Sequence, residues 1–364
     1  MAATTVAATT TTTTVSSRKR RLAGASTSTT TSSSTTHSVD YSLGIIHKDA
    51  PAGTLTDSQL ALLGEAEKPL PPTATTRTKM SHHVVMDDLN FKPMLRHCLT
   101  KLVDQPGACN GVADWDISRV TDCSWLLWEP RDPHDQDKNG DQEFVMVPGA
   151  EHFKVDVSRW NTSSCTSMRS MFQGAASFNA PIGSFDTSKV TDMAHMFHGA
   201  THFDHDLGTW NVEKVTDMSF MFEAALNYNN GNNHYFHTSA EGKPSPPLVK
   251  TDLNAWNVSK VETFQGMFWY AHAFNTPIGD WDVSRAHDEL VPFSFAFVST
   301  FDAAHTFNQN LSKWQIGPNV HHLNYMFQDA MAFNQDLSAW PVHQVTDFTS
   351  TYVVCVETRR RKRK

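Results

Sequence analysis

Two adjacent segments of the chain are copies of one another, and this repetition constrains the fold more than any other feature. The first segment, FNAPIGSFDTSKVTDMAHMFHGATH, begins at Phe178, and the second, FDHDLGTWNVEKVTDMSFMFEAALN, begins at Phe203. The large apolar positions of the two copies coincide at an interval of 25 residues. A period of about 20 to 50 residues is typical of arrays in which each copy buries its apolar side against the next. The sequence therefore predicts a stack of short repeats.

The same unit recurs along most of the chain, and an aromatic ring marks each copy. These anchors are Trp115, Trp160, Phe185, Trp210, Trp256, Trp281, Trp314 and Trp340. Where two anchors lie much more than 25 residues apart, the extra residues form insertions near 129–150, 230–250 and 286–296. Because the apolar pattern resumes after each insertion, we expect the eight rings to line up in one row.

Within each copy, two kinds of apolar spacing follow one another. Met193, Met196 and Phe197 recur at intervals of three and four, as on one face of a helix. Thr191 and Asp192 precede this stripe and offer an N-cap. In the other half of the copy, apolar and polar residues mix as in an extended segment. The pattern predicts an α/β repeat, namely a leucine-rich-repeat-like solenoid of about eight turns with one extended segment and one short helix per turn.

Composition divides the chain into parts around the repeats. The expected parts are a disordered Thr/Ser-rich tail and linker at 1–80, a helical N-terminal cap at 86–110, the repeat solenoid at 111–356 and a basic tail at 357–364. The tail is too poor in large apolar residues to offset the entropy of ordering. An apolar stripe through Leu95 and Leu99 predicts a helix within 87–103. We expect this helix to be the cap, because the first turn of an array needs a cover with one polar face.

One polar position follows the phenylalanine or tyrosine of successive copies. It is occupied by Asn179, Asp204, Asn229, Asn275, Asn308 and Asn334. A side-chain oxygen repeated at one place in a stack can accept hydrogen bonds from the next copy, which satisfies polar groups between copies. We therefore expect a ladder of such bonds.

Charge is distributed unevenly along the chain. The net charge is −8, and RKRR at 18–21 with RRRKRK at 359–364 holds ten positive charges, which leaves −18 for the rest. An acidic body argues against nucleic-acid binding along the solenoid, because phosphate contacts supply most of such binding. The basic C-terminus favours an intracellular, nuclear location through an import signal, with the cell surface as the alternative. No apolar run is long enough for a transmembrane segment.

Five cysteines are present, without the spacing of a metal site. Cys123 and Cys165 stand where other copies have methionine and valine, so they are interpreted as small core hydrophobes, a usage that fits a reducing compartment. Cys98 and Cys109 are candidates for a disulfide if the protein is secreted.

The consensus WNVSxVTDMxxMFxxAxxFNxxLxxW is carried by 210–222, 256–274 and 327–340. This string resembles the BspA-like leucine-rich-repeat surface proteins of bacteria and unicellular eukaryotes, over about 115–352. The resemblance implies a solenoid used for protein or surface binding, and it brings no catalytic residues. This chain lacks the expected export signal.

Two clusters of side chains suggest metal ions. Oxygen ligands at alternate positions around a glycine resemble half of a calcium loop, and they are Asp135, Asp137, Asn139, Asp141 and Glu143. The twelfth position of that loop is a methionine, so an acidic surface insertion is the alternative. Four neighbouring histidines suggest zinc or nickel, and they are His195, His198, His202 and His205. Their equivalents in the next copy are variable, which favours outward-facing side chains instead.

These observations favour a non-catalytic protein-binding scaffold of the leucine-rich-repeat type, with a protein partner of unknown identity. The candidate contact residues vary between copies on the extended segments, and they are His205, Asp206, Gln309, Asn310, Gln335 and Asp336. One alternative is a calcium-dependent cell-surface or adhesion protein, and another is an enzyme with a site formed by the insertions. The chain contains none of the common catalytic or nucleotide-binding motifs, and no cofactor is indicated apart from the metal ions named above.

Overall fold

The computed structural model places most of the repeat region and the residues just before it. It describes residues 85–105, 107–109, 111–130, 144–232, 252–289 and 294–351. These residues all belong to one unit, 44–364. The expected disordered tail and linker, the basic tail and most of each insertion lie outside the described residues, so those predictions stay predictions.

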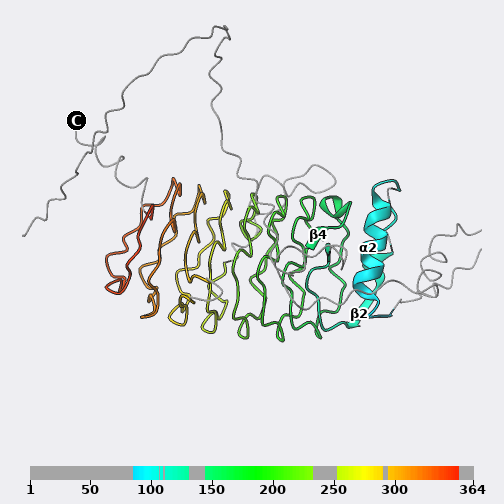
Figure 1. The fold of residues 1–364 in the computed structure, drawn as a ribbon, viewed down its shortest axis with the longest axis horizontal. Coiled ribbons are helices and arrows are strands. Elements are labelled where there is room, and N and C mark those ends of the chain that lie inside the picture. Colours follow the sequence, from blue (N-terminus) through cyan, green and yellow to red (C-terminus); the bar gives the residue numbers. More distant parts are fainter. Residues whose placement is uncertain are drawn as a thin grey trace, which may run out of the picture. The chain divides into compact units, whose positions relative to one another are not determined.

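A single α-helix occurs in the described part of the chain. This helix, α2, spans Phe91–Leu102 and lies within the segment where the apolar stripe predicted a helix. Its buried face holds Phe91, Met94, Leu95, Cys98 and Leu99, as expected from their spacing. The ring of Phe91 packs edge-on against the first two anchors, Trp115 and Trp160, with centroids 6.3 and 5.3 Å apart. The helix therefore covers the apolar side of the first copies (Figure 1).

The strands are short and lie near this helix. β1 (Val85–Asp87) pairs in parallel with β2 (Asp116–Arg119), and β3 (Trp128–Pro130) pairs antiparallel with β4 (Phe144–Met146) across the first insertion. Two short 3-10 helices, η1 (Val112–Asp114) and η2 (Ala150–His152), complete the regular elements. Each of the two sheets has two strands.

The predicted fold class is wrong. The chain does not form an α/β leucine-rich-repeat-like solenoid with one short helix per turn, because α2 is the one described α-helix and it precedes the repeats. The described copies consist of tight turns and irregular backbone, without a helix or a continuous strand in each copy.

Left-handed residues explain why no helix forms. Each complete copy from residue 170 onward has two residues with positive φ, four positions apart, as in His195 (φ 56°) and Gly199 (φ 71°). An α-helix requires right-handed angles at every residue, so either of these residues interrupts it. The spacing of Met193 and Met196 therefore comes from successive three-residue turns. Asp192, expected as an N-cap, instead accepts the N–H of Ala194, two residues later, at 2.9 Å.

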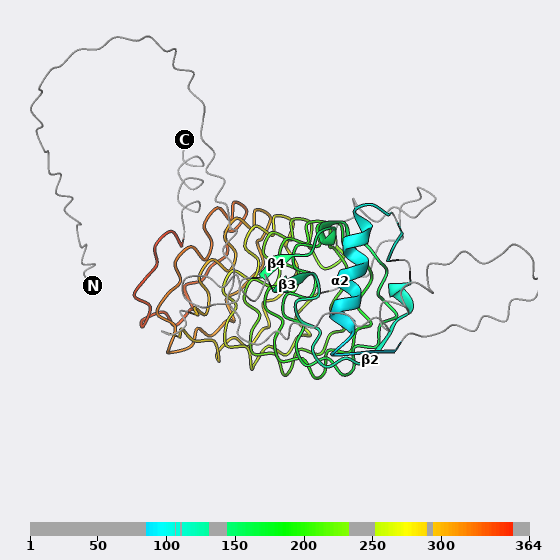
Figure 2. The ribbon, with the colours of Figure 1, turned by 45° about the vertical axis from the view of Figure 1, so that its right-hand side comes forward.

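The backbone bonds alternately within a copy and to the next copy. The N–H of His198 donates to the carbonyl of His195 in its own turn (3.1 Å), whereas the N–H of Phe197 donates to Met221 of the next copy (2.8 Å). Isolated parallel bridges join the copies at Asp122–Ser167, Ser167–Asp192, Asp192–Asp217, Asp217–Thr263 and His322–Asp347. Successive copies consequently lie side by side (Figures 1 and 2).

Aromatic side chains form rows across the copies. From Phe185 to Trp340, six of the eight anchors stack nearly parallel, with neighbouring centroids 6.1 to 6.5 Å apart, which confirms the expected row for those six. The buried tryptophans also bond to the preceding copy, as when Trp256 Nε1 donates to Leu207 O at 2.9 Å. Stacking combined with a satisfied indole N–H fixes the distance between copies.

The predicted polar ladder is confirmed. Asn229 Oδ1 accepts the N–H of Asn275 at 2.8 Å, and Asn275 Oδ1 accepts the N–H of Asn308 at 2.9 Å. The same bond links Asp204 to Asn179, Asn229 to Asp204 and Asn334 to Asn308. The ladder satisfies one backbone N–H in each copy.

The interpretation of two cysteines as free core side chains is wrong. Cys123 and Cys165 are buried, as expected, but they form a disulfide between neighbouring copies, with Cα atoms 5.6 Å apart. A second disulfide joins Cys98 of α2 to Cys109, with Cα atoms 5.4 Å apart. Both bonds lie at the end of the repeats that α2 covers.

Candidate functional site

In each copy, the two left-handed residues are the first and last residues of a five-residue segment. Adjoining copies place these segments side by side. We call them together the turn strip, and they are 170–174, 195–199, 220–224, 266–270, 299–303 and 325–329. The middle methionine, threonine or phenylalanine residues point into the core, whereas the first, fourth and fifth positions vary in burial and chemistry. Two groups of candidate functional side chains lie on this strip.

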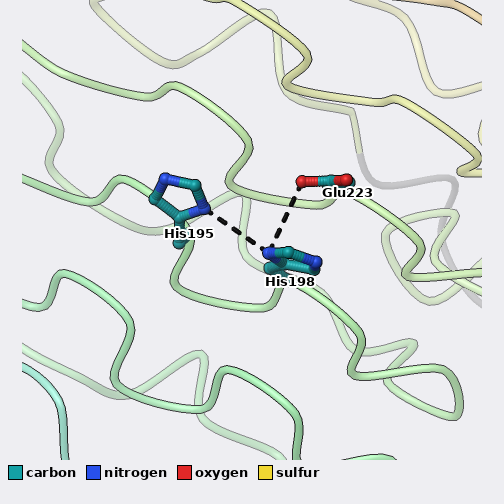
Figure 3. A group of neighbouring side chains, drawn as sticks. All are labelled: His195, His198 and Glu223. Atoms are coloured by element: carbon teal, nitrogen blue, oxygen red, sulfur yellow. Dashed lines mark hydrogen bonds and ion pairs between the residues drawn. The ribbon is translucent and has the colours of Figure 1, made fainter. Parts of the chain in front are cut away.

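The first group consists of His195, His198 and Glu223 (Figure 3). His195 Nδ1 lies 3.4 Å from His198 Nδ1, which in turn lies 3.4 Å from Glu223 Oε2. His195 and Glu223 are buried, at 4 and 7% exposure, and His198 is partly buried. Glu223 occupies the position equivalent to His198 in the next copy, so the group joins two copies.

Burial shifts both titratable partners toward their neutral forms. It lowers the pKa of His198 to about 4 and raises the pKa of Glu223 to about 8. At neutral pH the imidazole of His198 is therefore uncharged, with a proton on only one ring nitrogen, and the carboxyl group of Glu223 is protonated. The neutral imidazole of His198, the neighbouring imidazole of His195 and the carboxyl group of Glu223 can share a proton at this separation, or can bind a cation that displaces it.

The structure changes the interpretation of the four neighbouring histidines. It brings His195 and His198 together and buries His195, so the prediction of outward-facing side chains fails for that residue. His202 is exposed, and its Nδ1 lies 2.7 Å from the carbonyl of Ala176. His205 also takes no part in the group, because its Nε2 lies 3.0 Å from the carbonyl of Asn179. Sequence reasoning missed Glu223 as a partner, although the repeat alignment places it opposite His198.

A second set of metal-compatible side chains is less enclosed. Glu262, His287 and Glu289 each place one ligand atom within 4.8 Å of the others. Arg285 donates to Glu262 Oε1 at 3.0 Å, so a cation there would compete with the guanidinium. A surface depression lined in part by Arg285 and His287 adjoins these residues.

Further along the turn strip lies a second group, which we call the aromatic-acidic patch. It contains Trp269, Tyr270, Asp302 and Asp329, at the fourth and fifth positions of their segments, together with Tyr325 at the first position of the last segment. The rings of Trp269 and Tyr270 stack with centroids 5.7 Å apart, and the N–H of Tyr270 donates to the carbonyl of Asp302 at 2.9 Å. Tyr270 and Tyr325 keep 43 and 37% of their surface exposed. Both tyrosines have left-handed backbone, at φ 57° and 62°.

The acidic half of the patch consists of two neighbouring carboxyl groups. Asp302 is 6% exposed, and burial together with the nearby charge of Asp329 raises the pKa of Asp302 to about 7. A hydrogen bond from Gln328 opposes part of this shift. Among the described residues only part of this shift is offset, so a positively charged group beside the pair would favour its ionised form.

Two more rings flank the patch. The imidazoles of His272 and His305 stack with centroids 4.1 Å apart, and Tyr270 meets His272 edge-on. Met331, at the equivalent position of the next copy, is 63% exposed. One feature of the sequence could have revealed this surface, because Tyr270 stands where the earlier copies have Gly199 and alanine.

The contact residues predicted from the sequence make bonds within the chain. Gln309 Nε2 donates to Asn275 O at 2.7 Å, and Gln335 Nε2 donates to Asn308 O at 3.1 Å. His205 occupies the same column of equivalent positions. The other three residues accept the backbone N–H two residues later, and they are Asp206, Asn310 and Asp336. Their role in partner binding stays a prediction.

The predicted calcium ligands lie outside the described residues, so that prediction is also untested. They are Asp135, Asp137, Asn139, Asp141 and Glu143. Within the described ranges, no helix has the length and apolar character that crossing a membrane requires.

Comparison with known proteins yields one family. The family model described as "Mycoplasma protein of unknown function, DUF285" matches residues 144–243 and 247–361, which together make up more than half of the chain. No curated protein and no solved structure matches the chain. The turn strip and both groups of functional side chains lie within the matched residues.

Proposed function

The chain belongs to the DUF285 family, whose function is unknown, and on that premise we propose that it is a non-catalytic protein that binds a protein partner. The binding surface is the aromatic-acidic patch, and the partner presents an arginine or lysine side chain to it. The observation that carries the proposal is the left-handed backbone of two partly exposed tyrosines, Tyr270 and Tyr325.

Left-handed backbone is costly for a large side chain. A residue other than glycine gives up about 1 to 2 kcal/mol in this conformation. Gly199 fills the position of Tyr270 in an earlier copy without this cost, and stability alone would favour glycine in both copies. Strain held at an exposed aromatic residue is typical of a functional site.

The side chains of the patch are those that dominate protein interfaces. Tryptophan, tyrosine and methionine are enriched at such surfaces, because they bury a large area at a small cost in side-chain entropy. The segments of the turn strip contain no lysine or arginine. A guanidinium group from a partner can stack on Trp269 or Tyr270 and pair with Asp302, which complements the acidic pair.

The cell-surface location fits this function better than the nuclear one. The consensus motif resembles that of the BspA-like surface proteins, and the DUF285 match agrees with a repeat protein of that general kind. The two disulfides Cys98–Cys109 and Cys123–Cys165 favour an oxidising compartment. We therefore propose that the partner is met outside the cell.

A peptide-display selection tests the proposal. The full chain is used as bait, with prior depletion on the Tyr270→Gly variant, and the selected peptides are synthesised for binding by fluorescence anisotropy. We expect the peptides to be enriched in arginine or lysine. Tyr270→Gly and Asp302→Asn should each weaken their binding by at least about tenfold, the effect of losing roughly 1.4 kcal/mol.

Stability measurements separate binding from folding. Because glycine suits the left-handed backbone, the free energy of unfolding of Tyr270→Gly should lie within about 1 kcal/mol of that of wild type. Leu89→Ser, at an apolar residue that is 79% exposed in the turn before α2, should bind the peptides as wild type does. Peptides without basic residues, or peptides that bind wild type and Tyr270→Gly equally, would contradict the proposal.

A further inference from the structure

We propose that His195, His198 and Glu223 bind a divalent transition-metal ion of the zinc type, which joins two successive copies of the repeat. This site shares no residue with the aromatic-acidic patch, and its argument needs no protein partner. The metal belongs to a class that accepts imidazole nitrogen and carboxylate oxygen together.

The distances within the group match a metal site better than a hydrogen-bonded one. Both measured separations, His195 Nδ1 to His198 Nδ1 and His198 Nδ1 to Glu223 Oε2, are 3.4 Å. Hydrogen bonds to nitrogen donors span about 2.7 to 3.2 Å. Two ligands bound about 2.1 Å from a tetrahedral ion lie about 3.4 Å apart. An ion between the three atoms therefore needs little movement of the side chains.

The backbone and a neighbouring ring hold the ligands in place. The imidazole of His195 stacks on Phe220 with centroids 4.9 Å apart, which restricts its rotation. The N–H of Gly199 donates to the carbonyl of Glu223 at 2.8 Å, so the two copies are joined beside the site. A metal site requires this kind of support to keep its geometry without the ion.

The copy that precedes the site carries buried oxygen atoms at the two equivalent positions. Ser170 occupies the position equivalent to His195, and Gln173 the position equivalent to His198. Ser170 Oγ and Gln173 Oε1 are buried and have no hydrogen-bond partner among the described residues. At the same two positions of the next copy, His195 and His198 instead offer nitrogen atoms that an ion can bind.

The ion would link two successive copies of the repeat. Its ligands come from residues 25 positions apart in the sequence, His198 and Glu223, so binding ties one copy to the next. The unfolded chain holds these ligands far from the required geometry, and metal binding therefore stabilises the folded state.

Metal titration of the full chain, free of any histidine tag, tests the site. Zinc affinity is measured by competition with a chromogenic chelator, and cobalt is used as a spectroscopic probe. We expect one zinc ion per chain and cobalt d–d bands of tetrahedral intensity. His198→Gln and Glu223→Gln should each lower the zinc affinity by at least about tenfold, as the loss of a direct ligand requires. Glutamine already occupies this column at Gln173 and Gln328, so both variants suit the fold.

His202→Gln is the matched control, because His202 lies in the same copy but its imidazole faces the carbonyl of Ala176. This variant should bind zinc as tightly as wild type. X-ray absorption of the zinc-loaded wild type reads the ligands without any substitution and should show two imidazoles. No zinc binding at millimolar concentration, unchanged affinity in both ligand variants, or a spectrum without imidazole scattering would overturn the proposal.

Discussion

At the scale of single residues, side chains acquire their proposed roles through their position in a column of equivalent residues. His198 and Glu223 are equivalent residues of adjoining copies, and so are Trp269 and Asp302. The members of each pair lie on neighbouring copies that backbone bonds join, although the residues lie far apart in the sequence. Burial then shifts the pKa of each carboxyl group upward, to about 8 for Glu223 and about 7 for Asp302.

The shifted pKa of Asp302 predicts a dependence of stability on pH. The native state retains a proton on Asp302 between about pH 4 and pH 7, where the unfolded chain has lost it. The carboxyl group therefore contributes stability that is full below about pH 3.8 and is lost as the pH rises through 7. Allowing for solvent near the carboxyl group, we expect the free energy of unfolding of wild type relative to Asp302→Asn to fall by about 1 to 2 kcal/mol over this range.

Urea unfolding of both proteins at pH 4.5 and 7.5 measures this difference. Asp329→Asn removes the charge that faces Asp302 and should make the fall smaller, whereas Gln328 continues to donate to the carboxyl group. A difference between wild type and Asp302→Asn that stays constant across the pH range would show that Asp302 ionises normally.

Parts of these sites could be predicted from the sequence. The repeat alignment placed His198 opposite Glu223, but variability suggested exposed residues, because an alignment carries no information on burial. The strain at Tyr270 escaped notice for a similar reason, since a left-handed backbone favours glycine, asparagine, aspartate and histidine and has no signature in a tyrosine. Its signal was the tyrosine itself, at a position where earlier copies have small residues.

At the scale of the repeat element, the sequence determined which residues are buried but not the backbone that buries them. Met193, Met196 and Phe197 are all fully buried, as their apolar pattern predicted. Spacing of three and four is shared by an α-helix and by successive three-residue turns, so it could not distinguish the two. The left-handed φ of His195 interrupts any helix, so the segment forms turns. The polar ladder was predictable, because it depends on one position per copy and not on the type of turn.

Close backbone contact between copies predicts a specific sensitivity to side-chain size. A Cβ atom on Gly279 would meet the carbonyl oxygen of Asn310 in the next copy, which is backbone and cannot rotate away. Gly279→Ala should therefore lower the free energy of unfolding by about 1 to 3 kcal/mol, as overpacking does. Urea unfolding followed by tryptophan fluorescence measures the loss.

Ser338 is the matched control, since it occupies the same position in the last complete copy and is exposed. The free energy of unfolding of Ser338→Ala should lie within about 0.5 kcal/mol of that of wild type, because surface substitutions generally have small effects. Equal stability of Gly279→Ala and wild type would mean that these two copies lie further apart than the contact with Asn310 requires.

At the scale of the whole unit, one principle produces both the core and the functional groups. Backbone bonds hold equivalent residues of adjoining copies side by side, which stacks the tryptophan row inside and assembles the turn strip outside. A substitution in one copy consequently alters the packing of the adjoining copies. Function can arise anywhere along the array where two or three adjoining copies supply complementary side chains, as they do at His198 and at Asp302.

This side-by-side placement is the central claim, and pairwise cysteine crosslinking tests it most directly. Thr166, Thr191 and Thr216 are exposed equivalents, and the N–H of each later threonine donates to the carbonyl of the one before, at 2.9 and 2.8 Å. Cysteines at 191 and 216 should form a disulfide under mild oxidation, identified by mass spectrometry, whereas cysteines at 166 and 216, two copies apart, should not. Equal crosslinking of both pairs, or none at 191 and 216, would contradict the claim.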